Sequence, residues 1–257
     1  MCCAASPKVG LKKTAETDAI FEQVAAINQA ADADETVLRI SCDAKAVVKI
    51  GEFSRGGRSR VAVDAADHDF KPEAVLIPFG ILLPRWDELF LYFSPGYITA
   101  DFIVDRLDEW WREAKPRFPL VRMLVINQDN GPEHQSRRTQ FLKRIIEFAV
   151  THQLIVRLAY YPPYHSKYNS IERCWGVLEQ PWNAALLDEV QTVLNFAQSM
   201  TWKGQHPVVR LVETVYQTGV RLTQDAMQAL EAQIQRFPKL GKWFVDIIPP
   251  ALLSLDG

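Results

Sequence analysis

The sequence has no run of eighteen apolar residues, the minimum length for a membrane-spanning helix. Its first residues, MCCAASPKVGLKK, also lack the apolar stretch of a secretory signal peptide. The four cysteines form no C-x-x-C pair, which excludes the usual zinc and dithiol patterns. Cys42 and Cys174 are expected to be buried apolar residues in a reducing compartment. We therefore expect a cytoplasmic protein with no membrane partner.

The sequence also has no excess of basic residues over acidic ones. The chain carries 29 Lys and Arg against 31 Asp and Glu, a formal net charge of −2. Proteins that bind duplex DNA usually gain affinity by neutralising phosphates with basic side chains. Either DNA is not the partner, or the basic groups act locally and the main DNA-reading module lies elsewhere.

Familiar catalytic motifs are missing too. We find no G-x-S-x-G elbow, no Walker loop and no H-E-x-x-H motif, so no side-chain nucleophile is indicated. The sequence is rich in apolar residues: 48% of its 257 residues are hydrophobic, including seven Trp and thirteen Phe. This composition excludes general disorder and suits one large domain, or a core with a small helical annex.

The order of apolar patterns predicts a mixed α/β fold. Period-two and fully apolar runs indicate strands, and spacings of three and four indicate helices. The predicted elements are a helix at 17–31, strands at 36–42 and 47–53, a hairpin at 75–83 and 88–93, a helix from Thr99 to before Pro116, a strand at 121–126, a helix at 136–152, a strand at 154–159 and a helix from Ser170, with a wholly helical pattern after Glu179.

This order is that of an RNase H-like mixed β-sheet flanked by helices. We expect three parts: residues 1–35 as an N-terminal segment with one helix, 36–182 as the RNase H-like catalytic core, and 183–257 as a helical C-terminal extension. The single N-terminal helix is not a helix-turn-helix, which needs a second helix to enter a groove. The apolar stretch from Trp243 to Ile248 is expected to cover either the core or a partner chain.

Three acids fall at informative positions. Asp43 ends the first strand, Asp129 follows the central strand, and Glu172 opens the helix after the last core strand. The first and fourth strands of an RNase H-like sheet are neighbours, so these carboxylates would meet at one end of the sheet. Close carboxylates repel one another, and Mg²⁺ or Mn²⁺ relieves this because hard cations take oxygen ligands. Two such ions would promote attack on a phosphodiester.

Each acid also has a structural interpretation. Asp43 could cap a turn, and Asp129 in D-N-G could be turn chemistry. Glu172 and Asn169 fit a capping box, with Asn at the N-cap and Glu three residues later. A rival metal cluster is formed by Asp64, Asp67, His68 and Asp69, in a predicted loop with no strand to orient the ligands.

The segments around the three acids carry a family resemblance. They are ISCDAKA, VINQDNGPEHQSRR and YYPPYHSKYNSIERCWGVLEQPWN. The chain resembles the DDE transposases of bacterial insertion sequences, in the retroviral integrase superfamily, and looks most similar to the ISAzo-type group. The third segment is similar to mariner-like transposases, with its Pro-Pro-Tyr turn, Asn-x-Ile-Glu and a following aromatic. The resemblance covers roughly residues 17 to 248.

The resemblance implies a metal-dependent DNA transposase that performs DNA cleavage and strand transfer at insertion-sequence ends. It implies Asp43, Asp129 and Glu172 as catalytic metal ligands, about two Mg²⁺ or Mn²⁺ ions, and DNA as transposon end and target, with a homodimer as a possible assembly. Two features depart from the family. Ser170 stands where many relatives have Pro, and the N-terminal helix-turn-helix of relatives is absent, so we expect a truncated copy or a DNA-reading portion encoded elsewhere.

Basic residues near the acids are the predicted DNA contacts. Arg55, Arg58 and Arg60 lie in a Gly-rich loop that either tracks phosphates or is a solvated surface loop. Around the acids, the predicted contacts are Arg137, Arg138, His165, Lys167 and Arg173. Tyr164 and His165 are placed to stack on a base or to pack against the sheet edge.

Two other functions remain open. The same fold could serve a structure-selective nuclease, which would cleave DNA without joining it. A truncated, non-catalytic remnant could instead bind partners or inhibit a full-length transposase.

Overall fold

The computed structural model describes residues 16–51, 72, 74–182 and 185–253. The basic loop with Arg55, Arg58 and Arg60 lies outside these residues, as does the rival acidic cluster at 64–69. Within the described part, no helix is both long and apolar enough to cross a lipid bilayer.

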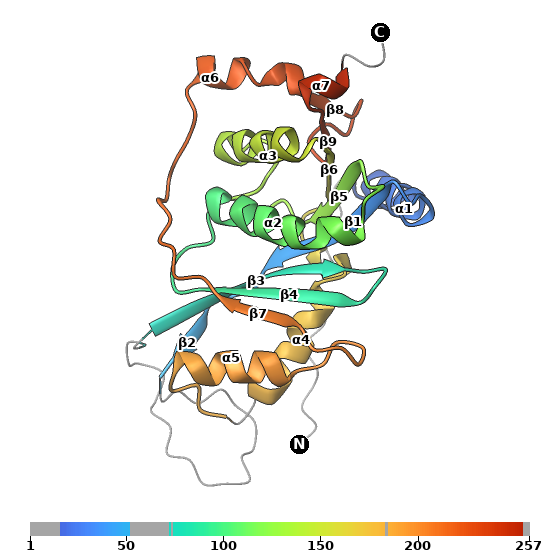
Figure 1. Ribbon diagram of the computed structural model, residues 1–257. Helices are drawn as coiled ribbons and strands as arrows, with labels where there is room; N and C mark the ends of the chain where they lie inside the picture. Colours follow the sequence, from blue (N-terminus) through green and yellow to red (C-terminus); the bar gives the residue numbers. More distant parts are fainter. Residues whose placement is uncertain (1–15, 52–71, 73, 183–184, 254–257) are drawn as a thin grey trace, which may run out of the picture.

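One nine-stranded mixed sheet organises the described chain (Figure 1). The strand order is β7-β4-β3-β1-β5-β6-β9-β8, and β2 also pairs with β3. Strands β1, β5 and β6 are parallel, whereas β3 and β4 form an antiparallel hairpin beside β1. The strands are β1 (Val37–Ala44), β2 (Val48–Ile50), β3 (Ala74–Leu83), β4 (Glu88–Ser94), β5 (Met123–Gln128), β6 (Ile155–Tyr160), β7 (Val208–Leu211), β8 (Ile234–Arg236) and β9 (Phe244–Ile247).

Burial explains why these runs are strands. β5 lies between two parallel neighbours, and its Leu124, Val125 and Ile126 are all buried, as a central strand requires. In β4, alternate residues face different layers. Leu89 and Leu91 join one apolar cluster, whereas Tyr92 joins the other. The period of two therefore gives the sheet a core on both faces.

Helices cover both faces of the sheet. Figure 1 shows α2 and α3 on one side of β1, β5 and β6, with α1 on the other. Helices α4 and α5 pack on β2, β3 and β4. The Thr99 side chain accepts a hydrogen bond from the Phe102 N–H, so the predicted N-cap of α2 is confirmed. The helices are α1 (Thr17–Ala33), α2 (Ala100–Ala114), α3 (Thr139–His152), α4 (Glu172–Glu179), α5 (Val190–Ser199), α6 (Gln224–Gln228) and α7 (Pro250–Leu253), with short 3₁₀ turns at Lys115–Arg117, Ser166–Tyr168, Gln180–Trp182 and Glu231–Gln233.

The wholly helical pattern expected after Glu179 is wrong. The segment holds α5, α6 and α7, but also three strands that extend both edges of the sheet. β7 pairs in parallel with β4, and β9 pairs antiparallel with β6. The runs V-V-R-L and F-V-D-I are only four residues long, too short to show a period of two, and their pairing with β4 and β6 makes them strands. The C-terminal apolar stretch thus covers the sheet edge of its own core.

Candidate active site

The parallel register of β1 and β5 places two acids level with each other. Ser41 on β1 pairs with Asn127 on β5. Asp43 and Asp129 each follow two residues later, Asp43 inside the end of β1 and Asp129 just beyond β5. Because parallel strands end at the same edge of a sheet, the two carboxylates come to the same edge. We define these two acids and Glu172 as the carboxylate trio.

Asp43 is the most buried member of the trio, with 8% of its surface exposed. Its Oδ2 accepts a hydrogen bond of 2.8 Å from the Trp175 Nε1. Burial raises the pKa of Asp43 to about 7, and the charges of Asp129 and Glu172 add to the rise. The Trp175 hydrogen bond and the nearby His134 act in the opposite direction. Asp43 therefore lies close enough to Asp129 and to Glu172 for the charge of each to affect its ionisation.

Asp129 is held in its ionised form. Its Oδ1 accepts a hydrogen bond of 2.6 Å from the His134 Nε2 and one of 3.2 Å from the Gly131 N–H. Burial acts to raise the pKa of Asp129, but the hydrogen bond and charge of His134 and the Gly131 N–H outweigh it and lower the pKa. The turn interpretation of D-N-G is therefore correct for the backbone, and the charge of the same carboxylate also raises the pKa of Asp43.

Glu172 begins α4, and a buried polar clasp fastens this helix start to β1. The clasp consists of Ser41, Asn169 and the Ile171 N–H. The Ser41 hydroxyl donates to the Asn169 Oδ1, the Asn169 Nδ2 donates to the Cys42 carbonyl (3.0 Å), and the Ile171 N–H donates to the Ser41 Oγ (3.1 Å). Ser41 and Asn169 are fully buried. The clasp thus ties the helix carrying Glu172 to the strand carrying Asp43.

The capping-box interpretation of Glu172 is wrong. Ile171 is the N-cap residue of α4, and no side chain caps this helix. The Asn169 amide is used in the clasp instead, where its Nδ2 donates to the Cys42 carbonyl. The Glu172 carboxylate is half-buried and has no hydrogen-bond partner among the described residues. It is therefore free to serve as a ligand.

Gly80 allows α4 to approach this edge of the sheet. On β3 it pairs directly with Asp43. A Cβ atom at Gly80 would lie 2.6 Å from the Ile171 Cδ1 and 2.9 Å from the Trp175 side chain, closer than real Cβ contacts. The absence of a side chain at this position lets the first turn of α4 pack against the strand beside Asp43.

Gly80→Ala is expected to push α4 away from β3. The added methyl group overpacks a buried contact, and such changes cost about 1–3 kcal/mol. We expect a lower melting temperature together with weaker metal-dependent stabilisation. Gly176→Ala is the matched control, because nothing lies within 4 Å of its added Cβ. A Gly80→Ala protein that keeps wild-type stability and metal response would contradict the packing role.

The carboxylate oxygens of the trio are suitable ligands for a divalent cation, although the described side chains do not form a complete metal site. Among the described residues, no group of three His, Cys, Asp or Glu side chains is arranged to hold a metal ion. Asp43 and Asp129 each use one carboxylate oxygen for Trp175 and His134, and the other oxygen has no hydrogen-bond partner in the described part of the chain. Three carboxylates with free oxygens match the preference of Mg²⁺ and Mn²⁺ for hard ligands.

The predicted DNA-contact residues near the trio divide into two groups. Arg137, Lys167 and Arg173 are exposed. Arg138 is ion-paired with Glu133 at 3.1 Å and is largely covered. His165 is only 4% exposed, and it packs against Phe21 and Tyr168. We therefore do not carry His165 into the DNA-contact proposal.

The sequence reasoning missed the residues that orient the acids. His134 lies five residues after Asp129 in QDNGPEH, and its ring fixes that carboxylate. Trp175 is buried, as an aromatic residue on the inner face of a helix is expected to be, and its Nε1 also donates a hydrogen bond to Asp43. Ser41 gave no signal at all, because its partner Asn169 lies 128 residues away in the chain.

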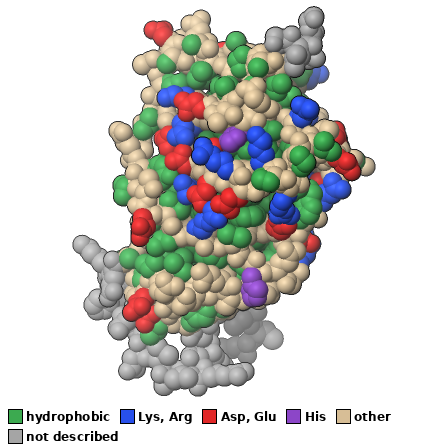
Figure 2. All heavy atoms as spheres, in the orientation of Figure 1, with side chains coloured by type: hydrophobic (Ala, Val, Ile, Leu, Met, Phe, Trp, Pro, Cys, Tyr) green, Lys and Arg blue, Asp and Glu red, His purple; other side chains and the backbone are tan. Residues whose placement is uncertain are grey.

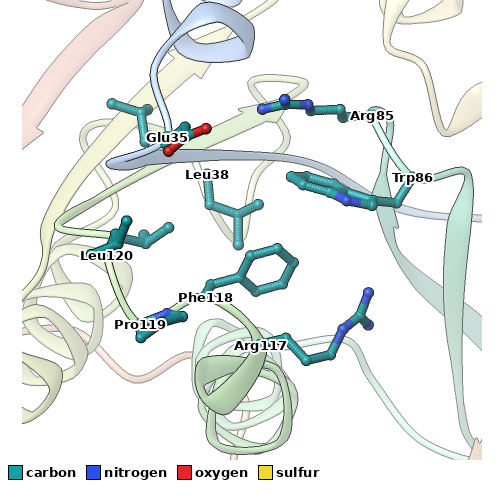
Figure 3. A pocket seen from close by; sticks show the side chains of 10 residues that line it. Glu35, Leu38, Arg85, Trp86, Arg117, Phe118, Pro119 and Leu120 are labelled. Atoms are coloured by element: carbon teal, nitrogen blue, oxygen red, sulfur yellow. The ribbon is translucent and has the colours of Figure 1, made fainter.

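A separate cavity of about 300 Å³ lies away from the trio (Figure 3). It is lined by Leu38 near the start of β1, by Trp86 in the β3–β4 turn, and by Phe118. Asp43 lies at the other end of β1, so this cavity is not part of the candidate active site.

Comparison with known proteins shows the family of the chain. The model of the family described as "Rhodopirellula transposase DDE domain" matches residues 5–249. The chain belongs to this transposase family. Comparison with curated protein sequences gave no match.

Solved structures show the same fold as this DDE domain. The Mos1 transposase paired-end complex with left transposon end aligns with a TM-score of 0.53 at 10% sequence identity, over 76% of this chain and 57% of the Mos1 chain. The Mos1 mariner paired-end complex with Mg aligns with a TM-score of 0.48 at 11% identity, over 79% and 62% of the two chains. The first match confirms the RNase H-like fold. The DDE domain spans less than two thirds of these Mos1 chains.

Proposed function

We propose that this chain is the catalytic domain of a metal-dependent DNA transposase, which cleaves DNA at insertion-sequence ends and joins the freed end to target DNA. The observation that supports the proposal is at Asp43: this buried carboxylate lies at the end of β1, and the charges of Asp129 and Glu172, from two other elements, both raise its pKa. Membership of a DDE transposase family supports the same assignment.

The trio would hold the divalent cations. When bound, Mg²⁺ or Mn²⁺ would activate the attacking oxygen and stabilise the leaving oxygen of a phosphodiester. Trp175 and His134 each hold one oxygen of Asp43 and of Asp129, which leaves the second oxygen of each carboxylate available to a cation. Because the pKa of Asp43 is about 7, this carboxyl gives up a proton when a cation binds. Cation binding should therefore tighten as the pH rises through 7.

Two successive reactions use the same residues. In the first, water attacks the phosphorus at the end of the element, and the 3′ oxygen of the cleaved strand leaves with a proton. In the second, this 3′ hydroxyl attacks a target phosphodiester, and the target strand's own 3′ oxygen leaves. Each step exchanges one P–O bond for another, so no external energy source or side-chain nucleophile is needed.

DNA is the proposed partner, held by local rather than global positive charge. Figure 2 shows Lys and Arg side chains lying among Asp and Glu side chains on one face. Ion pairs explain part of this mixture: Arg144 contacts Asp101 and Asp105, and Arg210 contacts Glu113. The exposed Arg137, Lys167 and Arg173 near the trio are the remaining candidates for phosphate contacts. A homodimer and a cytoplasmic location also remain part of the proposal.

The salt dependence of DNA binding tests this local charge. Each phosphate contact contributes a slope of about −0.9 to the plot of log K against log salt concentration. We expect a shallow slope in the wild type and a loss of about one contact in Arg137→Gln. Arg122→Gln is the control, because Arg122 is equally exposed but begins the opposite end of β5. A wild-type slope near ten contacts, or equal effects of both variants, would contradict the proposal.

A cleavage and joining assay tests the function itself. Labelled duplexes containing the DNA that flanks the coding sequence are incubated with the full chain and Mg²⁺ or Mn²⁺, with Glu172→Gln as the inactive control. We expect metal-dependent nicking at one position and transfer of the 3′ end to a second DNA. Cleavage without joining would favour a structure-selective nuclease. No cleavage with either metal would favour a non-catalytic remnant.

A further inference from the structure

A cavity of about 340 Å³ is lined in part by Asp129. One wall is the loop that follows β6, from Tyr161 to Ser166, and the opposite wall is Lys242 and Trp243, just before β9. A hydrogen bond of 2.9 Å from the Tyr160 N–H to the Trp243 carbonyl fixes the two walls together. The C-terminal strand pair therefore completes a cavity that opens beside a trio carboxylate.

The inside of this cavity is partly apolar. Tyr161 and Trp243 are buried and line it. Asn130, the residue after Asp129, and Gln135 add polar side chains to the lining. Apolar rings beside a few polar groups suit a flat heteroaromatic ligand.

The rim carries an aromatic ring and a positive charge. Tyr164 is 69% exposed, and its backbone has a φ of 63°, in the left-handed region that bulky residues rarely adopt. Such strain often occurs where a side chain is held out for binding. Lys242 is exposed, with its Nζ 4.7 Å from the centre of the Trp243 ring. The cavity thus combines an exposed aromatic ring with a cation at its rim.

We propose that this cavity binds a single unstacked nucleotide of the DNA strand, next to the phosphate that is cleaved. The Tyr164 ring stacks on the base, and Lys242 faces a backbone phosphate. The inference rests on the proposed function, because Asp129 lines the cavity and would place the occupant beside the reacting phosphate. Stacking is tolerant of base identity, so any of the four bases should be accepted.

Equilibrium binding of modified duplexes tests this inference without requiring catalysis. A labelled duplex with the DNA flanking the coding sequence is bound to the full chain, and an abasic residue is moved along one strand, one position at a time. We expect one position where loss of the base weakens wild-type binding by about tenfold, the usual effect of losing one base–aromatic stack. Tyr164→Ala should weaken binding of the intact duplex by a similar factor.

The decisive result is the coupling between the two changes. In Tyr164→Ala, the abasic residue at that position should cause no further loss, because the base and the ring act as one contact. Tyr164→Phe keeps the ring and should behave like the wild type. Tyr97→Ala is the matched control, since Tyr97 is 72% exposed but lies at a different cavity. The abasic effect should persist in that variant.

Failure of this inference is distinguishable from failure of the proposed function. If no position shows the abasic effect, or if Tyr164→Ala retains it in full, the nucleotide cavity is overturned even when metal-dependent cleavage is observed. If the coupling is found but neither metal supports cleavage, the cavity stands as a DNA-binding site and the catalytic proposal fails.

Discussion

Asp43→Asn is expected to abolish metal-dependent DNA cleavage, by at least about a thousandfold, while making the metal-free fold more stable. The substitution keeps the shape of the side chain and the acceptor for Trp175, but it removes the negative charge. The wild-type carboxylate is costly to ionise because it is buried and faces Asp129 and Glu172. Loss of the negative charge removes that cost, which stabilises the metal-free fold. The same change removes a carboxylate ligand for the cation, which prevents cleavage.

The pH dependence of stability follows from the raised pKa of Asp43, which moves from 3.8 to about 7 in the folded protein. Between pH 3.8 and 7 the folded state binds a proton at Asp43 more tightly than the unfolded state does. Protonated Asp43 therefore stabilises the fold at low pH, and this contribution is lost as the pH rises through 7. Three pKa units correspond to about 4 kcal/mol, and the coupling among the acids makes about 2–4 kcal/mol the expected range. The pKa of Asp129 is lowered in the folded protein, so its ionised form contributes to stability. This contribution is lost as the pH falls through the lowered pKa.

Denaturant unfolding from pH 4 to pH 8 measures this effect, in the absence and presence of Mg²⁺. Wild type and Asp43→Asn should have similar stability near pH 4 and diverge towards pH 8, with the variant more stable. Added Mg²⁺ should stabilise only the wild type. Asp188→Asn, at an exposed carboxylate before α5, should change neither quantity. A destabilised Asp43→Asn that still responds to Mg²⁺ would contradict the assignment.

Asn169→Ala is expected to lower the cleavage rate by about a hundredfold, comparable with the loss of a supporting group around a metal site. The Asn169 side chain is 1% exposed and joins α4 to β1 through the Ser41 hydroxyl and the Cys42 carbonyl. Without it, Glu172 loses its fixed position relative to Asp43. The unsatisfied Cys42 carbonyl should also lower the free energy of unfolding by about 1–3 kcal/mol.

Metal titration separates misplacement of Glu172 from general destabilisation. At a temperature where Asn169→Ala is fully folded, half-maximal activity should require more Mg²⁺ than in the wild type, and high Mn²⁺ should restore part of the rate. Asn195→Ala, at an exposed amide on α5, is the control and should keep wild-type metal dependence. A variant with reduced stability but an unchanged metal requirement would show that the clasp is only structural.

The positions of the acids were predictable because they depend on strand order. Asp43 and Asp129 follow apolar runs whose lengths identify a first strand and a central strand, and parallel neighbours end at one edge. The RNase H-like fold was predicted from the same order and is confirmed. The pattern around Glu172 was ambiguous, since Asn-x-x-Glu fits both a capping box and a site residue.

The edge strands and the orienting side chains were not predictable from local patterns. V-V-R-L and F-V-D-I are too short to show a period, and only their pairing with β4 and β6 makes them strands. The hydrogen bond from Trp175 to Asp43 and the clasp at Asn169 join residues 132 and 128 positions apart. Such contacts depend on the packing of α4 over Gly80, which no local spacing encodes.

Crystals of the full chain grown with Mn²⁺ test the shared-cation assignment most directly, through anomalous scattering from the metal. We predict an anomalous peak bound by oxygens of Asp43, Asp129 and Glu172, with the Trp175 and His134 contacts retained and the peak absent in Asp43→Asn. A fully occupied Mn²⁺ elsewhere on the chain, with the three carboxylates empty and apart, would contradict the proposal that these acids hold the catalytic metal.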